Sequence, residues 1–230
     1  GPHGVHLAAR LIGHADVPAE DLVILDPEPR LLGQWRRWTG AVGMAHLRSP
    51  SVHHLGLLPF ELRQRPRQIA PGLKRPFARP YQRPHRTLFD KHSDQVIERF
   101  GLAERHRRGR ALAVHPGPDG VRVETTLGPL RADRVVLAVG QPAPARPSWA
   151  PKHLPADRVA HCLAPGFDRD AWTGRGPVAV VGGGLTGAQL ALALEAEGTP
   201  VLHLRRHPWR VHLFVSDPGW IGPKHMAAFS

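Results

Sequence analysis

The fold of this chain is decided by the stretch Val178-Ala179-Val180-Val181-Gly182-Gly183-Gly184-Leu185-Thr186-Gly187. A short β-branched apolar run, typical of a buried parallel strand, leads into a G-x-G-x-x-G turn. In such a turn the first glycine allows a tight bend, the second lets the backbone approach a pyrophosphate, and the third lets helix and strand pack closely. The N–H groups and the positive dipole end of the following helix then face the phosphates. We therefore predict a dinucleotide site whose cofactor contacts are Gly182, Gly184, Leu185, Thr186 and Gly187.

The residues after this turn complete a strand–helix–strand unit. Residues 188–197 are strong helix formers, and Gly198 is well placed to end the helix. Val201–Leu204 is the second predicted strand, which gives the unit about the ~30 residues expected of a dinucleotide-binding β-α-β unit. The alternative is an ordinary glycine-rich turn between a strand and a helix.

The end of the second predicted strand distinguishes between the two nicotinamide dinucleotides. NAD-binding units usually place Asp or Glu there, where it accepts hydrogen bonds from the adenosine ribose. Here the strand leads into Arg205 and Arg206, and Arg205 lies 23 residues after Gly182 (205 − 182). A guanidinium grips a 2′-phosphate in a bidentate manner, whereas a carboxylate would repel it. We therefore predict NADPH, bound by Arg205 and Arg206; the alternative is that both arginines are only solvated.

The chain begins with four residues that match the last positions of another G-x-G-x-x-G turn, Gly1-Pro2-His3-Gly4. Val5–Ile12 continues as a predicted helix, and Leu22–Leu25 is a predicted strand that ends in Asp26. An acidic residue at this point suits an adenosine ribose without a 2′-phosphate, so the two sites together imply FAD first and NADPH second. The residues predicted to bind FAD are Gly1, Pro2, Gly4 and Asp26. The alternative is an ordinary start followed by a helix and a strand.

A β-rich segment lies between the two predicted sites. Short strands are predicted at 111–115, 121–126 and 130–132, with turns rich in glycine and proline between them. Arg134–Gly140 is predicted to be a buried strand. Because ligands sit beyond the carboxyl ends of parallel strands, we predict that Ala138, Gly140 and Gln141 contact FAD. Residues 142–147 are predicted to form an extended linker.

Composition limits the classes of protein that this chain can belong to. The chain has 230 residues, a net charge of +12 and a single cysteine. No apolar run approaches the ~20 residues that span a bilayer, so we expect no membrane partner. Cys162 alone forms no intrachain disulfide or Cys-x-x-Cys pair, and a free thiol suits the cytoplasm. Prolines interrupt the most basic stretch, 63–86, and the histidines form no four-ligand set, so we expect neither nucleic acid nor metal.

The order of these features resembles the two-dinucleotide-domain flavoprotein monooxygenases, and especially their lysine/ornithine N-hydroxylating branch and its uncharacterised relatives. The likeness is carried by the two glycine turns and by the stretches 31–35, 43–50, 137–141 and, faintly, 216–229. The resemblance implies that Trp35, Met44, Leu47 and Arg48 lie toward the flavin ring. Each has a structural alternative, such as a core aromatic for Trp35 and a surface charge for Arg48. The usual Asn-Glu pair is missing, which argues against a lysine- or ornithine-type amine as substrate.

The predicted fold class is α/β. We expect a Rossmann-like FAD-binding domain with a β-rich insert at 1–147, without its first strand, and a linker at 148–176. Residues 177–230 are expected to begin a second Rossmann-like domain, which binds NADPH. The chain is expected to be truncated at both ends, and its oligomeric state is not predicted.

The resemblance also implies a reaction in two halves. NADPH passes a hydride to FAD, and the reduced flavin reacts with O2 to give a C4a-(hydro)peroxide that oxygenates a small substrate. The cofactor carries this chemistry, so we expect no catalytic residue in the chain. One alternative is a flavin-dependent NAD(P)H reductase or dehydrogenase without oxygen transfer, and another is a non-catalytic dinucleotide-binding redox module.

Overall fold

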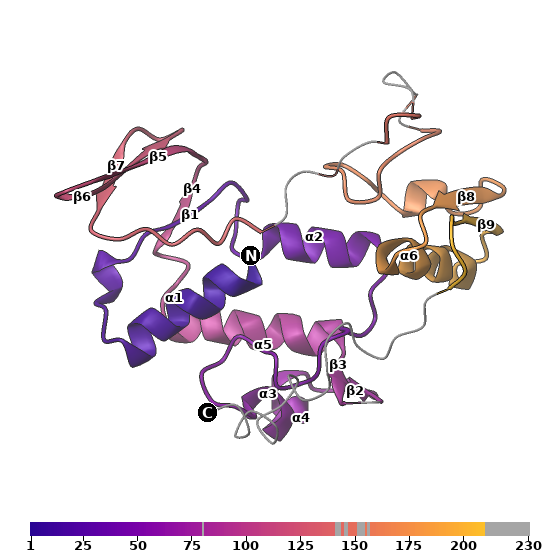
Figure 1. Ribbon diagram of the computed structural model, residues 1–230. Coiled ribbons are helices and arrows are strands. Elements are labelled where there is room, and N and C mark those ends of the chain that lie inside the picture. The colour runs from indigo at the N-terminus through magenta and orange to yellow at the C-terminus, as the bar shows by residue number, and fades with distance from the viewer. Residues whose placement is uncertain (80, 141–143, 145–146, 151–154, 156, 210–230) are drawn as a thin grey trace. The chain divides into compact units, whose positions relative to one another are not determined.

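The computed structural model describes residues 1–79, 81–140, 144, 147–150, 155 and 157–209. The chain combines helices with small sheets, so the prediction of a mixed α/β chain is confirmed (Figure 1). The chain forms two compact units, each assembled from separated segments. The first unit contains Gly1–Trp35, Ser51–Pro76 and Thr87–Gln141, and the second contains Arg36–Pro50, Phe77–Arg86 and Pro142–Ser230.

Two long helices supply much of the core of the first unit. The helix α1 (Pro2–His14) begins with a proline, whose fixed φ suits the first helical turn, and it buries Val5, Ala8 and Ala9. The helix α5 (Arg86–Arg99) buries an apolar stripe that includes Leu88, Phe89 and Val96. Short helices lie between them in sequence: η1 (Ala19–Asp21), α3 (Glu61–Gln64) and α4 (Pro66–Ile69). Further buried apolar side chains of this unit are Leu31, Leu32, Leu55, Leu62, Ile69 and Leu102.

A buried histidine is an unusual member of this core. His92 of α5 is 1% exposed, and neither ring nitrogen has a hydrogen-bond partner among the described residues. Its ring lies 5.0 Å from that of His54, and Nε2 is 4.0 Å from Glu61 Oε1. Burial, and secondarily the charge of His54, lowers the pKa of His92 to about 4. The imidazole is therefore neutral at physiological pH.

The strands of the first unit form two small sheets. β1 (Ile24–Asp26) pairs in parallel with β4 (His106–Arg108), which places Asp26 opposite Arg108. β5 (Ala111–Gly117), β6 (Gly120–Thr125) and β7 (Leu130–Ala132) form an antiparallel sheet in that order (Figure 1). The predictions of a β-rich segment after residue 110 and of a strand ending at Asp26 are therefore confirmed, although β1 starts two residues later than predicted.

The prediction of a buried strand at Arg134–Gly140 is wrong. No residue of this segment is assigned to a strand, and Val136, Leu137 and Val139 are 62%, 67% and 79% exposed. An apolar run forms a buried strand only where a neighbouring strand accepts its backbone hydrogen bonds and another layer covers its side chains. Within the described residues, this segment has neither a strand partner nor a covering layer.

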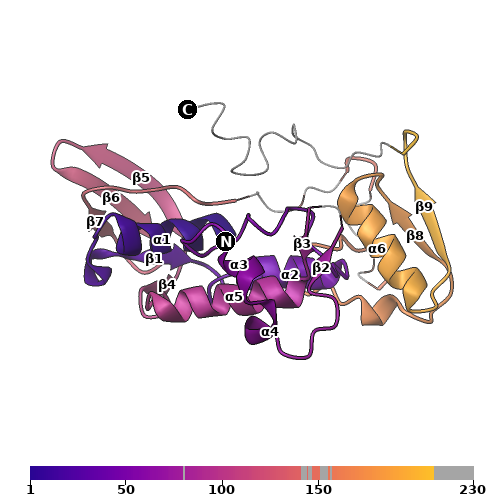
Figure 2. The same cartoon turned by 90° about the horizontal axis from the view of Figure 1, so that it is seen from below.

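The second unit contains the strand–helix–strand arrangement predicted from the glycine turn. β8 (Val178–Val181) and β9 (Val201–Leu204) pair in parallel, and α6 (Leu185–Ala196) connects them and packs against both (Figure 2). The helix ends at Ala196, and Gly198, the glycine predicted to terminate it, follows with φ +80°. The Thr199 N–H bonds back to the Leu194 carbonyl at 3.0 Å. The unit also contains most of α2 (Gly33–Ala41), β2 (Phe77–Ala78), β3 (Arg83–Pro84) and η2 (Asp170–Trp172).

The core of the β8–α6–β9 arrangement is formed by Val180, Leu190 and Leu194. The segment that the sequence assigns to a linker contributes partly buried Cys162, Phe167 and Trp172 to it. Each described parallel sheet has only two strands, so the larger parallel sheets of Rossmann-like domains are not seen in this part of the chain. None of the described helices has both the length and the apolar character needed to cross a bilayer.

Candidate dinucleotide sites

The glycine turn between β8 and α6 has a backbone geometry that its three motif glycines permit. Gly182 has φ +131°, in a region that residues with a side chain rarely adopt. A Cβ atom on Gly187 would collide with the Gly182 carbonyl oxygen, so this position needs glycine for close packing of helix on strand. By contrast, a Cβ on Gly184 would meet nothing within 4 Å. Gly184 therefore faces open space, as a backbone that receives a ligand must.

The N-terminus of α6 provides hydrogen-bond donors at this open space. Gly184 is the N-cap and supplies no side-chain cap, and the first helical hydrogen bond runs from the Ala188 N–H to the Gly184 carbonyl at 3.0 Å. The N–H groups of Leu185, Thr186 and Gly187 therefore have no helical acceptor. Backbone donors at the positive end of a helix suit an anion such as a pyrophosphate, so this turn fits the predicted cofactor.

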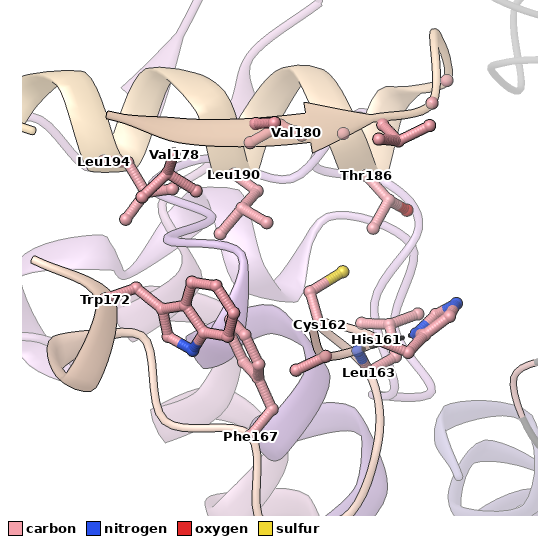
Figure 3. Close-up of a pocket in the computed structure, with 16 residues that line it drawn as sticks. His161, Cys162, Leu163, Phe167, Trp172, Val178, Val180, Thr186, Leu190 and Leu194 are labelled. Carbon is pink, nitrogen blue, oxygen red and sulfur yellow. Dashed lines mark hydrogen bonds between the residues drawn. The ribbon is translucent and has the colours of Figure 1, made fainter. Parts of the chain in front are cut away.

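A cavity of about 370 Å³ adjoins the glycine turn (Figure 3). Five consecutive residues, 178–182, line it, which places it along the edge of β8 that faces away from β9. Figure 3 shows apolar side chains of β8 and α6 pointing into it from one side and those of Cys162, Phe167 and Trp172 from the other. The polar lining near the turn comes from Thr186 and His161. Burial raises the pKa of the Cys162 thiol, which keeps it protonated.

The end of β9 brings Arg205 to the glycine turn. The position of a Cβ on Gly183 lies 3.0 Å from the Arg205 Cβ. The guanidinium lies over the ring of Trp209, with 4.9 Å from Cζ to the ring centroid, and its Nη1 donates to the His207 carbonyl at 2.7 Å. Arg206 is exposed. Arg205 is thus close to the predicted pyrophosphate site, while the structure shows no comparable contact for Arg206 among the described residues.

The predicted FAD contacts at the start of the chain lie around the N-terminus of α1. Its first helical hydrogen bond runs from the Val5 N–H to the Gly1 carbonyl at 3.1 Å, and a Cβ on Gly1 would meet nothing within 4 Å. The Asp26 carboxylate lies 3.5 Å from the Gly1 nitrogen, and a Cβ on Gly4 would lie 3.5 Å from the Ala138 side chain. Open helix donors beside a carboxylate suit a phosphate and a ribose hydroxyl, so this end of α1 fits FAD.

The other residues predicted to contact FAD have separate surroundings. In the first unit, the Trp35 indole N–H donates to Asp90 Oδ1 at 3.3 Å, and its ring lies 5.5 Å from that of Phe89. In the second unit, the Met44 carbonyl accepts a hydrogen bond from Arg86 Nε at 3.2 Å. Leu47 is 3% exposed, Arg48 is partly buried, and Gly140 of the first unit is exposed. Gln141 lies outside the described residues, and the roles of all of these at the flavin stay predictions.

Comparison with known proteins places the chain in a family. The model of the FAD-NAD(P)-binding family matches residues 1–142, well over half of the chain, and the chain belongs to this family. FAD and NAD(P)H are therefore its cofactors, and the chain is a flavoprotein whose family indicates a flavin-dependent oxidoreductase. No curated protein and no solved structure matches the chain.

Sequence reasoning missed two residues beside the glycine turn. The His203 ring nitrogen Nε2 lies 2.8 Å from the Gly182 carbonyl oxygen, and the His203 ring lies 5.0 Å from that of Trp209. The sequence predicted β9, and with it the position of His203, but nothing in the pattern indicated a bond to the turn. Trp209 follows a proline outside any strand or helix, where periodicity gives no information about side-chain placement.

Proposed function

We propose that this flavoprotein is an NADPH-dependent monooxygenase that transfers one oxygen atom of O2 to a small organic substrate. The single observation that carries the NADPH half is the placement of Arg205 against Gly183 of an open glycine turn. An arginine that follows the second strand and lies beside the glycine turn suits the 2′-phosphate of the adenosine ribose. The monooxygenase half is supported by the resemblance of the order of features along the chain to the two-dinucleotide-domain monooxygenases.

The residues of the chain have binding and orienting roles in this proposal. The free N–H groups of Leu185, Thr186 and Gly187 bind the NADPH pyrophosphate, and the Arg205 guanidinium binds the 2′-phosphate. The N-terminus of α1 binds the FAD pyrophosphate, and the Asp26 carboxylate accepts hydrogen bonds from its ribose. FAD, when bound, supplies the redox chemistry by accepting a hydride from NADPH and delivering electrons to O2.

The β8–α6–β9 arrangement is, in this proposal, the first part of a Rossmann-like domain. Three properties support that assignment: the parallel pairing of β8 and β9, the helix that joins them, and the glycine turn at the carboxyl end of β8. The proposed partners are a small-molecule substrate and O2. A lysine- or ornithine-type amine is not favoured as the substrate, because the Asn-Glu pair usual in that branch is missing from the sequence.

Isotopically labelled O2 tests the oxygen-transfer step. The full chain is loaded with FAD, supplied with NADPH and offered a panel of amines, thioethers and ketones, and products are analysed by mass spectrometry. We expect one labelled oxygen atom in the product that forms. NADPH consumption with all labelled oxygen recovered as hydrogen peroxide or water across the panel contradicts the proposal and identifies a reductase or an oxidase instead.

A further inference from the structure

Five residues, Gly182, Gly183, His203, Arg205 and Trp209, form a closed series of contacts around the glycine turn and the end of β9. His203 Nε2 lies 2.8 Å from the Gly182 carbonyl oxygen, and the ring of His203 meets that of Trp209 edge-on at 5.0 Å. The guanidinium of Arg205 lies over the Trp209 ring, with Cζ 4.9 Å from the ring centroid, and the Arg205 Cβ lies 3.0 Å from the position of a Cβ on Gly183. Since a carbonyl oxygen only accepts, Nε2 of His203 carries the proton and donates it in this hydrogen bond.

This series holds the Arg205 side chain in one place. An exposed arginine has many rotamers, and a ligand that needs one of them must restrict the others on binding. Here the Trp209 ring supports the guanidinium from one face, and the His207 carbonyl accepts from Nη1 at 2.7 Å. Nε and Nη2 make no hydrogen bond to any residue that the structure describes. The three N–H groups on these two nitrogens are therefore left for a ligand, on a guanidinium that is already held.

We propose that Trp209 is a positioning residue that presets Arg205 for a phosphate on the adenosine ribose and so contributes to selectivity for the 2′-phosphorylated dinucleotide. This inference rests on the proposed binding of NADPH at the turn. Trp209 is 46% exposed, so its ring is not held there by burial in the core. Its contacts are with Arg205 and His203, which are the residues that join the end of β9 to the glycine turn.

Calorimetric titration of the full chain with NADP⁺ and with NAD⁺ tests the role of Trp209 without turnover. We expect Trp209→Ala to weaken NADP⁺ binding by about two- to fivefold, the range of an exposed cation–π contact, and to leave NAD⁺ binding unchanged. Trp209→Phe retains an aromatic face and is expected to restore most of the NADP⁺ affinity. The matched control is Trp149→Ala, because Trp149 is 68% exposed and belongs to the same unit but makes none of these contacts.

A double variant separates a positioning role from direct contact with the ligand. In an Arg205→Ala background, Trp209→Ala is expected to cause no further loss of NADP⁺ affinity, because Trp209 acts through Arg205. An equal loss for NADP⁺ and NAD⁺ overturns the inference, since it would show that Trp209 contacts a part that both dinucleotides share. If the wild type prefers NADP⁺ and the Trp209→Ala variant keeps the same preference, only the inference about Trp209 is overturned. A wild type that binds NADP⁺ no more tightly than NAD⁺ overturns the proposed NADPH specificity as well.

Discussion

Two glycines of the β8–α6 turn are expected to respond in opposite ways to the same added methyl group. A Cβ on Gly187 collides with the Gly182 carbonyl oxygen, which is backbone and has no rotamer that relieves the overlap. A Cβ on Gly184 meets nothing within 4 Å, and Gly184 has φ −84° and ψ 176°, which alanine adopts without strain. The first substitution therefore perturbs the fold of the turn, and the second perturbs only the space in front of it.

The magnitudes follow from these surroundings. Gly187→Ala gains about 1 kcal/mol of helix propensity but loses about 2–3 kcal/mol, the upper part of the range for overpacking, because the overlap is with a backbone atom. We therefore expect a net decrease of about 1–2 kcal/mol in the free energy of unfolding. Gly184→Ala replaces a favoured N-cap residue, which destabilises the fold, but it also lowers the entropy of the unfolded chain, which stabilises the fold. We therefore expect the free energy of unfolding to change by no more than about 0.5 kcal/mol. Its methyl group, however, keeps a pyrophosphate from the helix donors. Losing a charge-assisted hydrogen bond is worth about 1.5–3 kcal/mol, or roughly a 10- to 150-fold increase in Kd for NADPH.

Urea denaturation and NADPH titration of the same preparations measure the two effects. Gly184→Ala is expected to unfold at the wild-type midpoint and to bind NADPH weakly, whereas Gly187→Ala is expected to unfold at a lower urea concentration. Gly40→Ala is a control outside the turn, because a Cβ on Gly40 meets nothing within 4 Å. Wild-type NADPH affinity in Gly184→Ala would refute the assignment of the pyrophosphate to this turn. Unchanged stability in Gly187→Ala would refute the packing argument.

Three further substitutions test other parts of the account. Arg205→Ala is expected to weaken NADPH binding by about 1.5–3 kcal/mol with little effect on NADH, and equal wild-type kinetics with both dinucleotides would contradict this assignment. Asp26→Ala is expected to lower the FAD content of the purified chain, with Asp26→Asn less affected because it keeps an acceptor; an unaltered content in Asp26→Ala counts against the site at α1. Burial lowers the pKa of His92 from an ordinary 6.5 to about 4 in the folded chain. As the pH falls below 6.5, His92 therefore takes up a proton in the unfolded chain before it does so in the folded chain, which favours unfolding. The free energy of unfolding is then expected to decrease by about 3 kcal/mol between pH 6.5 and pH 4 through this group. In urea unfolding measured at a series of pH values, His92→Leu is expected to lack this pH-dependent loss. A pH profile identical to that of the wild type would contradict the assignment of the loss to His92.

Periodicity and glycine spacing predicted the two strands of the second-unit arrangement to the residue, and the helix between them to within three residues. β8 and β9 have the predicted bounds, and α6 follows the glycine turn as expected. These elements are predictable because their signals are local: a β-branched run, a turn that needs glycine at 182 and 187, and a run of strong helix formers.

Arg134–Gly140 shows where that reasoning fails. Its apolar run has the same local signal as β8, yet it is exposed, because strand formation depends on a partner that no local pattern specifies. The helix α5 was missed for a related reason. Its sequence is mostly polar and charged with few apolar residues, so it lacks the apolar stripe that predicts a core helix. Its buried face also includes His92 and Ser93, which a sequence pattern does not identify as core residues.

The contacts around Arg205 illustrate the same limit within the site. The sequence placed Arg205 at the end of a strand, where a 2′-phosphate is expected, and the structure places it against Gly183. The support from Trp209 depends on a bend at residues 206–207, after which the indole lies against the guanidinium. Side-chain placement of this kind follows from the path of an irregular segment, which neither periodicity nor composition encodes.

The most direct test of the central claim is an anaerobic titration of the FAD-loaded full chain with NADPH, followed through the visible absorbance of the flavin. We expect the chain to retain FAD on gel filtration and NADPH to bleach the flavin absorbance completely, with NADH much slower and with Arg205→Ala removing the difference between the two. A chain that retains no FAD, or whose bound flavin stays oxidised in excess NADPH, would contradict the account.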